Sequence, residues 1–364
     1  MTVFATSQFI AVNAKQQVTI PAGIFLVTGY AWGAGGGGGG LTNGGSGSSG
    51  DLVVFSVAVQ PGDVLDIAVG AGGVSGTSVT GTDSDGNTTG GAGGSGGFAR
   101  TGYGGGSGGS GGSRHGNGGG GGGGGGGATT IAYIPINGSP TGNVVAIAGG
   151  GGGGGGGSKN PGSSAFNSNS SGPTTDHRGA DGQSGDYFYA GGGGGGGGGY
   201  AGGGGGAHGE SDAGSTGNGG VPGEGGSSWY DPVRTTQLNK AGIFHGGGPL
   251  VTPAHSINSA GTIYSVSDNG NGYSFGGGPA SNGGDGVVLL EFYTQPNPWV
   301  KVNGVWKKVT TAFVKAGAAW KTVAQVWIKQ NGEWLRVNSG QSTFTTTTLA
   351  SGVDYGTSSR GYGS

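Results

Sequence analysis

The sequence predicts a mostly β fold with packed polyglycine II helices, a small C-terminal module of β-hairpin repeats and essentially no α-helix. Three observations lead to this prediction: long unbroken glycine runs, short β-branched segments before and after them, and a 14-residue repeat near the C-terminus. The chain has 364 residues, of which 104 are Gly and 13 Pro, so about a third are residues that the interiors of ordinary helices and sheets avoid. An ordinary enzyme domain is therefore not expected.

The composition also argues against two other classes of glycine-rich chain. Only 9% of the residues are charged, and the 12 Phe, 12 Tyr and 7 Trp need a packed environment, which is unusual for a disordered protein. Collagen requires glycine at every third position, whereas these glycines form unbroken runs. The chain has no cysteine, so disulfides and thiolate metal sites are excluded. We expect neither a signal peptide nor a membrane span.

Three apolar segments predict β-strands. Residues Val18–Trp32 indicate two strands around a turn at Pro21-Ala22-Gly23, and Leu52–Val69 indicates a hairpin around the turn Gln60-Pro61-Gly62-Asp63. Gly286–Tyr293 indicates one more strand. We expect this last strand to join the N-terminal sheet, which would place everything between them in one domain.

Between these strands lie the glycine runs. They are Gly35–Gly40, Gly118–Gly127, Gly149–Gly157, Gly191–Gly199 and Gly202–Gly206. Fixing a backbone costs about 1–2 kcal/mol per residue, and a net hydrogen bond returns about 0.5–1.5 kcal/mol, so a run can be ordered only if nearly all its amides are paired. Polyglycine II helices packed side by side meet this condition, with pure runs buried, bonded mainly to one another, and mixed segments such as Gly102–Gly106 at the rim. The alternative is a set of disordered linkers.

The chain changes character near residue 295. Residues 1–298 carry seven Lys/Arg and fifteen Asp/Glu, a net charge of −8, whereas residues 299–337 carry seven basic residues and Glu333 alone, a net charge of +6. This predicts a glycine-rich domain over 1–294, a linker at 295–298, a repeat module at 299–337 and a Thr/Ser/Gly-rich tail at 338–364.

The repeat module has a constant period of 14 residues. Trp306, Trp320 and Trp334 keep this phase, and Asn303-Gly304 and Asn331-Gly332 between alternating apolar residues predict tight hairpin turns. Each repeat therefore predicts two short strands. We expect the Trp residues to form a repeated core and the Lys residues to be solvated at the strand surface. Contact of these residues with a sugar or an anionic glycan is the alternative.

Several motifs carry a family resemblance. They are Ile20-Pro21-Ala22-Gly23, Ala31-Trp32-Gly33-Ala34 before a glycine run, Gln60-Pro61-Gly62-Asp63, Ala68-Val69-Gly70-Ala71-Gly72-Gly73, and Gly284-Asp285-Gly286-Val287-Val288. Together they resemble the glycine-rich domain of bacteriophage tail-fibre and tail-tip proteins. The long glycine runs resemble the polyglycine II sandwich of the receptor-binding adhesins of T-even-like phages, and the Trp-rich repeats are similar to those of phage tail structural proteins.

The resemblance implies a virion protein of the tail or tail fibre, made in the host cytoplasm. It would bind a bacterial surface receptor, a glycan or an outer-membrane protein, through loops between the polyglycine helices, and it would contact other phage tail proteins. A homotrimer is one of the oligomeric states that the sequence leaves open. The expected function is that of a tail-fibre or tail-tip structural protein that binds a host receptor. A passive fibre or adaptor is the alternative, and a glycan depolymerase is a weaker one.

The loops between the glycine runs hold the candidate receptor-binding residues. Aromatic and hydrogen-bonding side chains on rigidly mounted loops are typical of recognition surfaces, with capping of the glycine runs as the alternative role. The candidates are Phe166, Tyr187, Phe188, Tyr189, Trp229, Tyr230 and Arg234.

Other chemistry is not expected. The five histidines have no zinc-like spacing, no phosphate-binding or dinucleotide motif stands in a convincing context, and the glycine-rich part is acidic, which disfavours nucleic acid. The carboxylate pairs Asp83/Asp85, Asp181/Asp186 and Glu210/Asp212 lie in turn-rich segments, where solvation and Asx turns explain them better than glycoside hydrolysis. We therefore predict no enzyme activity, no cofactor and no metal.

Overall fold

The computed structural model describes most of the chain up to residue 294 and six short strands beyond it. The described residues are 2–10, 16–78, 80–82, 87–99, 103–112, 114–115, 118–136, 143–158, 160–165, 177–185, 190–210, 218–234, 242–244, 276–294, 299–302, 305–308, 313–316, 319–322, 326–330 and 333–337. Throughout these ranges the chain is all-β, without a helix, as predicted. The tail at 338–364 and the linker at 295–298 lie outside them.

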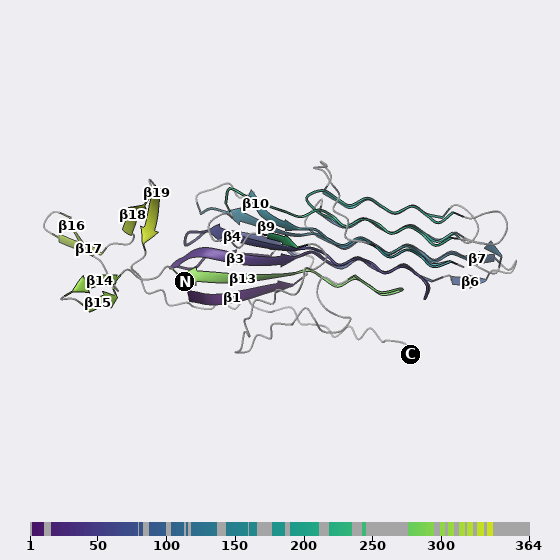
Figure 1. Cartoon of the computed structure of the whole chain (residues 1–364), viewed down its shortest axis with the longest axis horizontal. Helices are drawn as coiled ribbons and strands as arrows, with labels where there is room; N and C mark the ends of the chain where they lie inside the picture. Colours follow the sequence, from purple (N-terminus) through teal and green to yellow (C-terminus); the bar gives the residue numbers. More distant parts are fainter. Residues whose placement is uncertain are drawn as a thin grey trace. The chain divides into compact units, whose positions relative to one another are not determined.

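The first five-stranded sheet is antiparallel and brings together strands that are distant in the sequence. Its order is β1 (Thr2–Ile10), β13 (Val287–Thr294), β3 (Ile24–Trp32), β4 (Leu52–Ala58) and β12 (Gly242–Phe244). The predicted strand near residue 287 therefore lies between β1 and β3 and pairs with both. This confirms that the chain closes its N-terminal sheet with a strand that follows all the glycine runs (Figure 1).

The second five-stranded sheet shows that the predicted hairpin over Leu52–Val69 is wrong. Its order is β11 (Trp229–Tyr230), β10 (Asn143–Ala148), β9 (Thr129–Ile134), β5 (Val64–Ala68) and β2 (Gln16–Thr19), all antiparallel. β4 belongs to the first sheet and β5 to the second, and β2 and β3 are divided in the same way. The turn at Gln60–Asp63 forms as predicted, with Gly62 at φ 89°, but it connects two sheets. A local turn signal does not specify which sheet the chain enters next.

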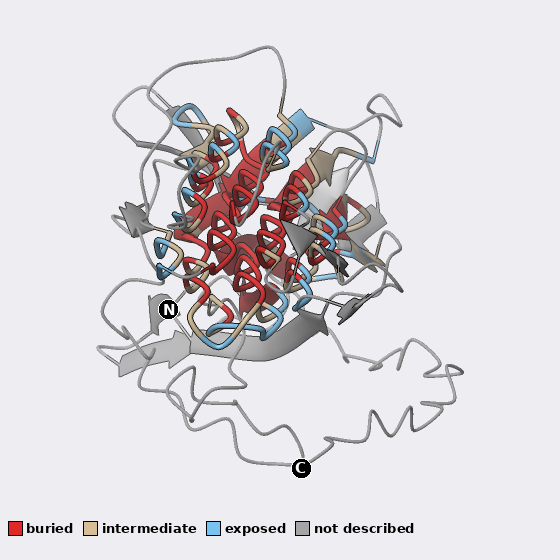
Figure 2. Ribbon diagram, turned by 90° about the vertical axis from the view of Figure 1, so that its right-hand side faces the viewer, coloured by how far each residue is buried: buried red, intermediate tan, exposed pale blue. Residues whose placement is uncertain are grey.

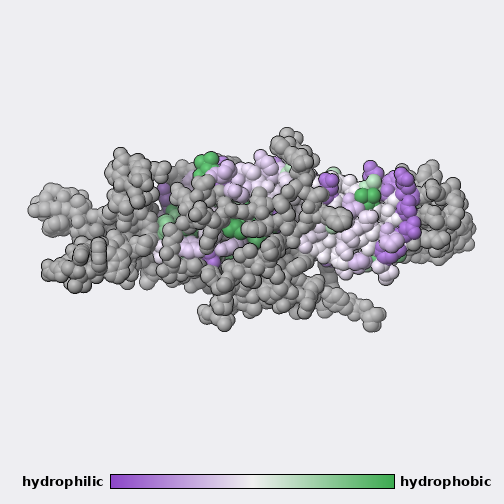
Figure 3. Space-filling view, viewed as in Figure 1, coloured by the Kyte–Doolittle hydropathy of each residue, from purple (hydrophilic) through white to green (hydrophobic). Residues whose placement is uncertain are grey.

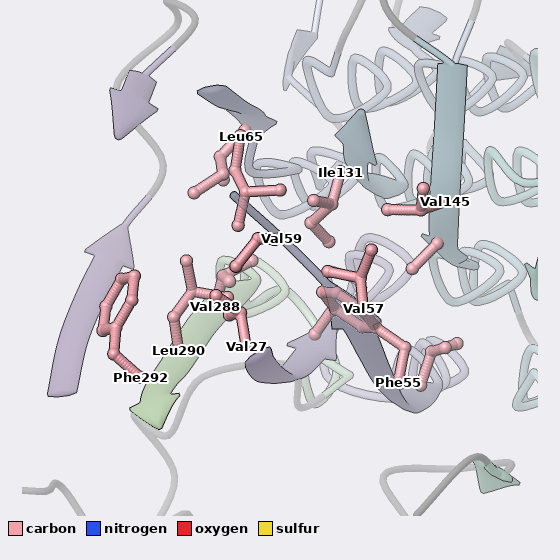
Figure 4. Packing of buried hydrophobic residues seen from close by; sticks show 14 of the residues in the cluster. Val27, Phe55, Val57, Val59, Leu65, Ile131, Val145, Val288, Leu290 and Phe292 are labelled. Atoms are coloured by element: carbon pink, nitrogen blue, oxygen red, sulfur yellow. The ribbon is translucent and has the colours of Figure 1, made fainter. Parts of the chain in front are cut away.

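The hydrophobic core lies between these two sheets. Val27, Val57, Val288, Leu290 and Phe292 of the first sheet face Leu65, Ile67, Ile131 and Val145 of the second, and all are buried (Figure 4). Phe55 of β4 is fully buried and pairs directly with Gly29 of β3. A Cβ atom at Gly29 would lie 2.2 Å from Phe55 Cζ, so the missing side chain makes room for the phenyl ring.

The other face of the first sheet carries a second buried cluster. It contains Tyr30, Trp32, Leu52, Val287 and Leu289, with rings of Tyr30 and Trp32 stacked at 6.4 Å. Nearby, the Tyr293 hydroxyl donates a 2.6 Å hydrogen bond to Oε2 of Glu291, which is 1% exposed. Burial, and then the adjacent Glu291 carboxylate, raise the pKa of Tyr30 to about 12.

This shift predicts a loss of stability in alkali. Because the folded state holds the Tyr30 proton more tightly than the unfolded state, the stabilisation is complete below pH 10 and is lost as the pH rises from 10 towards 12. We expect the Tyr30→Phe variant to lose less unfolding free energy over this interval, by up to about 1.4 kcal/mol per pH unit. Denaturant unfolding at several pH values would measure this, and equal pH dependence in both proteins would contradict it.

The glycine-rich segments extend the strand pairs beyond the two sheets. The chain leaves β3 at Gly33, returns at Asp51 and enters β4, so that Trp32 and Leu52 are paired across the excursion. Longer excursions with several passes connect β5 to β9 and β10 to β11. We call the passes glycine segments; they are 33–40, 44–51, 69–78, 90–99, 103–112, 118–128, 149–158, 177–185, 190–199, 202–210, 218–228 and 276–286. They run side by side away from the sheets (Figure 1).

Hydrogen bonds between glycine segments recur every three residues. The N–H groups of Gly120, Gly123 and Gly126 donate to the carbonyls of segment 149–158 at 2.8 Å. Those of Gly121, Gly124 and Gly127 donate to segment 69–78, at 2.8–3.1 Å. Those of Gly122 and Gly125 donate to segment 103–112, at 2.8 and 2.9 Å. The N–H groups of successive residues in one segment therefore donate to three neighbouring segments in turn.

The carbonyls of segment 118–128 bond to three further segments, which makes six bonded neighbours in all. These neighbours are 33–40, 69–78, 90–99, 103–112, 149–158 and 190–199. Glycines 119–127 are all buried, and the buried stretches of the segments lie in the middle of the bundle in the end-on view (Figure 2). The short pure run Gly202–Gly206 is only partly buried, and Gly205 is exposed. The pure runs are thus bonded to mixed segments as well as to one another, which differs from the expectation that they would bond mainly among themselves.

The mixed segments carry their side chains at the outside of the bundle. In segment 90–99, Gly91, Gly94 and Gly97 are buried, whereas Ala92, Ser95 and Phe98 are exposed. The Gly-Gly-X spacing therefore turns one side chain in three to solvent, and the described surface over the segments has nearly neutral hydropathy (Figure 3). This agrees with the expectation that mixed segments form the rim.

The repeat region contains three short antiparallel hairpins. They are β14 (Trp299–Val302) with β15 (Val305–Lys308), β16 (Phe313–Ala316) with β17 (Ala319–Thr322), and β18 (Val326–Gln330) with β19 (Glu333–Val337). In each hairpin a Lys position pairs with the repeated Trp position, for example Lys301 with Trp306. The strands follow the predicted 14-residue repeat, while the turn residues lie outside the described part. By contacts, the chain divides into two units, one ending at Gln295 and the other containing 296–364 together with Pro21–Gly23.

Candidate functional site

The ends of the glycine segments away from the two five-stranded sheets form what we call the far end. Segment 33–40 runs to the far end and turns at Leu41, which has φ 70°, before segment 44–51 returns. A small three-stranded sheet also lies there; it consists of β6 (Thr80–Thr82), β7 (Asn87–Thr89) and β8 (Arg114–His115) (Figure 1). The described surface becomes more hydrophilic towards this end (Figure 3).

Four of the candidate residues lie outside the described residues. Tyr187, Phe188 and Tyr189 fall between segments 177–185 and 190–199, and Phe166 follows residue 165. The two segments are antiparallel, because the N–H groups of Gly193 and Gly196 donate to Gln183 and Ala180, both at 2.8–2.9 Å. Their flanking residues Gly185 and Ala190 are at the far end, where both bond to segment 103–112. The far end thus presents the two attachment points of the Tyr187–Tyr189 stretch.

Trp229 and Tyr230 lie in β11, at the sheet side of the glycine segments and away from the far end. They pair with Ile147 and Ala146 of β10. Tyr230 packs against the main hydrophobic core, whereas the Trp229 ring stacks on Tyr200 with ring centroids 5.4 Å apart. Both side chains are half-buried. These contacts are with residues of the core and with Tyr200 at the end of segment 190–199, as expected for side chains that cap glycine segments.

Tyr200 continues a row of four aromatic rings that the sequence did not reveal. Its ring lies 6.1 Å from His177, which stacks in parallel on Tyr103 at 4.6 Å. His177 also bonds through Nδ1 to the Tyr200 carbonyl at 2.6 Å. Tyr103 and Tyr200 directly adjoin glycine runs, and His177 stands two residues before Gly179, so each ring sits where a glycine segment begins or ends. An aromatic residue next to a glycine run was therefore the signal in the sequence from which this row of rings could have been predicted.

Arg234 belongs to a polar cluster beside β9. Its guanidinium lies 5.7 Å from the Tyr133 ring centroid and 3.5 Å from Asp231. The Tyr133 hydroxyl donates to Asp63 at 2.7 Å, and the buried Asp63 carboxylate also accepts the N–H groups of Gln60 and Ile136. Burial, together with this hydrogen bond, raises the pKa of Tyr133 above its ordinary value. The Asp63 carboxylate therefore closes its own turn and bonds that turn to β9 and to the residues that follow β9. Arg234 packs on the Tyr133 ring beside it.

The described side chains do not assemble a reaction centre that we can recognise. Among them there is no group of three His, Cys, Asp or Glu residues placed to hold a metal ion. Each of the three carboxylate pairs considered above has at least one member outside the described part. Asp181 instead pairs with Arg178 at 2.9 Å and accepts the Ser107 N–H. No helix suited to crossing a membrane is found in the described ranges.

The structure thus separates the candidates into two groups. Trp229, Tyr230 and Arg234 lie at the sheet side and contact neighbouring structural residues, whereas the chain enters and leaves the Tyr187–Tyr189 stretch at the far end. In comparisons with known proteins, no protein-family model matches the chain and no curated protein matches it significantly.

Proposed function

We propose that the glycine segments are polyglycine II helices packed in a lattice that acts as a rigid mount. Such a helix has three residues per turn and no internal hydrogen bonds, so its amides point outward in three directions. The three-residue recurrence of hydrogen bonds and the six neighbours of segment 118–128 support this proposal. Only glycine permits this spacing, since a Cβ atom at any of Gly121–Gly126 would lie 2.0–2.3 Å from a carbonyl oxygen of another segment.

We further propose that the chain is a tail-fibre or tail-tip component of a bacteriophage virion that binds a host surface receptor without catalysis. The resemblance of its glycine-rich and Trp-rich motifs to phage tail proteins supports the virion assignment. The lattice carries the functional argument, because bonds to several neighbouring segments fix the described residues from which each loop starts and at which it ends. Rigidly mounted loops rich in aromatic residues suit recognition at low entropic cost. The receptor would be a glycan or an outer-membrane protein.

Within this proposal, recognition belongs to the far end. The Tyr187–Tyr189 stretch is attached there, and its three aromatic residues suit a small, specific contact. Trp229 and Tyr230 have structural partners at the sheet side and would act mainly by closing the glycine segments. The alternative is a passive fibre or adaptor whose Trp repeats attach it to another virion protein; a depolymerase would release reducing sugar from host polysaccharide.

A competition experiment tests the proposal. Isolated protein should block adsorption of the phage to its host. Replacing Tyr187, Phe188 and Tyr189 together by Ala should weaken that competition at least about thirtyfold, because each interface aromatic contributes about 2–4 kcal/mol. The melting temperature of this variant should stay close to that of the parent protein.

The matched control is Trp229→Ala, at the sheet side. We expect this variant to lower the melting temperature by breaking the stack with Tyr200, while competition by the folded fraction is unchanged. If the isolated protein does not compete at all, the passive-fibre alternative is favoured. If Trp229→Ala abolishes competition and the triple variant does not, recognition lies at the sheet side.

A further inference from the structure

The outer strands of the two five-stranded sheets differ greatly in length. β2 has four residues, β12 three and β11 two, whereas β1, at the edge of the first sheet, has nine. An edge strand leaves one row of backbone N–H and C=O groups without a ladder partner. Proteins usually protect such edges by making them short, charged, bulged or covered. Three of the four edges here are protected by their shortness.

β1 has little protection of its own. Its sequence, Thr-Val-Phe-Ala-Thr-Ser-Gln-Phe-Ile, contains no charged residue and no proline. The register with β13 is irregular between Val3 and Ala5 but regular from Ala5–Phe292 to Ile10–Val287. Among the described strands, β13 is the one that pairs with β1 (Figure 1). Six consecutive residues of β1 therefore form a regular ladder with β13, and no other described strand pairs with their opposite edge.

We propose that β1 is the interface through which two copies of this chain associate, by antiparallel pairing of β1 with β1 of the second copy. Such a contact is isologous, because one strand supplies both sides of the ladder, and it closes after two copies. In an antiparallel ladder, the two residues of a facing pair point their backbone N–H and C=O groups either both towards the other strand or both away from it. In a symmetric pairing of β1 with β1, a residue near the middle of the strand therefore faces the same residue of the second copy. Gln8 lies near the middle of the regular stretch.

The composition of β1 fits a second copy as the occupant. Self-pairing brings identical residues close to the two-fold axis, where any charge would face a like charge and oppose association. β1 is uncharged throughout, so this penalty is absent. Pairing would extend the first sheet into a continuous sheet across both copies, by the strand-addition mode that proteins use for peptide recognition. This inference does not depend on the proposed receptor function.

Charge placed at Gln8 tests the interface. Analytical ultracentrifugation of the full chain should show dimers at increasing protein concentration. Gln8→Lys and Gln8→Glu should each weaken dimerisation at least about tenfold, and an equimolar mixture of the two variants should restore it, because opposite charges then meet across the pair. Gln17→Lys, on the exposed edge strand β2 of the second sheet, is the matched control and should dimerise like the parent protein.

Melting curves separate an interface effect from a folding effect, and recovery in the mixture shows that both variants are folded. A parent protein that stays monomeric would overturn the proposal. So would a trimer, or dimers whose stability is the same with Gln8, Lys or Glu at this position. Association by another face would leave all three proteins equally dimeric.

Discussion

Replacing Gly122 by valine should unfold the glycine-rich part or lower its stability severely. A Cβ atom at Gly122 would lie 2.0 Å from the Gly193 carbonyl oxygen and 2.5 Å from its carbon. This carbonyl cannot move away without breaking the hydrogen bond that it accepts from the Gly109 N–H. The Gly122 N–H donates to Gly109 and its carbonyl accepts from Gly94. Because each buried polar group left unpaired costs about 1–3 kcal/mol, we expect a loss of about 2–6 kcal/mol. Thermal and denaturant unfolding would measure it.

Gly204→Val is the matched control for this substitution. Gly204 also lies in a pure glycine run, but its Cβ would meet only the flexible Glu224 side chain, at 3.3 Å. We expect this variant to lose less than about 1 kcal/mol, as surface substitutions usually do. Equal melting of the Gly122→Val variant and the parent protein would show that the segments do not pack as described.

Phe55→Ala should be the most damaging substitution between the sheets. The ring is fully buried and fills the space over Gly29, so truncation leaves a cavity above a residue that has no side chain. Loss of a buried Phe costs about 3–5 kcal/mol. Because the main glycine excursions begin and end at paired strands, we expect the glycine segments to lose order in the same transition. Circular dichroism and glycine amide exchange would follow the two parts separately.

Val233→Ala provides the control, since Val233 is 86% exposed. Its melting temperature should match that of the parent protein. If Phe55→Ala melted the sheets while the glycine amides stayed protected, the two parts would be independent, and the sheets would not be required to hold the glycine segments.

The positions of β2, β3, β4, β5 and β13 were predicted from the sequence because β-branched and aromatic residues mark them, whereas β1, β9 and β10 were not predicted. The pairing of Val287–Thr294 with the N-terminal strands was predicted for the same reason, since that strand needed buried partners. The partners of β4 and β5 could not be predicted. A Pro-Gly turn has the same local conformation whether it joins two strands of one sheet or crosses to another. Which strands share a sheet depends on how the apolar faces of all ten strands of the two five-stranded sheets pack together.

The neighbours of each glycine segment were beyond prediction for a different reason. A run such as Gly118–Gly127 has no side chains, so nothing in its sequence distinguishes one register or one partner from another. The burial of the longer pure runs and the exposure of side chains at the rim could be predicted, because a Cβ atom has no room inside. The expected burial was wrong for part of Gly202–Gly206, where Gly205 is exposed. The row of Tyr103, His177, Tyr200 and Trp229 could not, since its four members come from separate excursions that only the packed segments bring together.

Hydrogen exchange of the glycine amides tests the packed arrangement most directly. With glycine labelled in 15N, the amides of Gly120–Gly127, each bonded to a neighbouring segment, should exchange as slowly as those of the interior strand β13. Amides at the rim, such as that of Gly204, should exchange much faster. Uniform exchange of all glycine amides at the rate of an unstructured chain would contradict the account, because it would mean that the runs are flexible linkers.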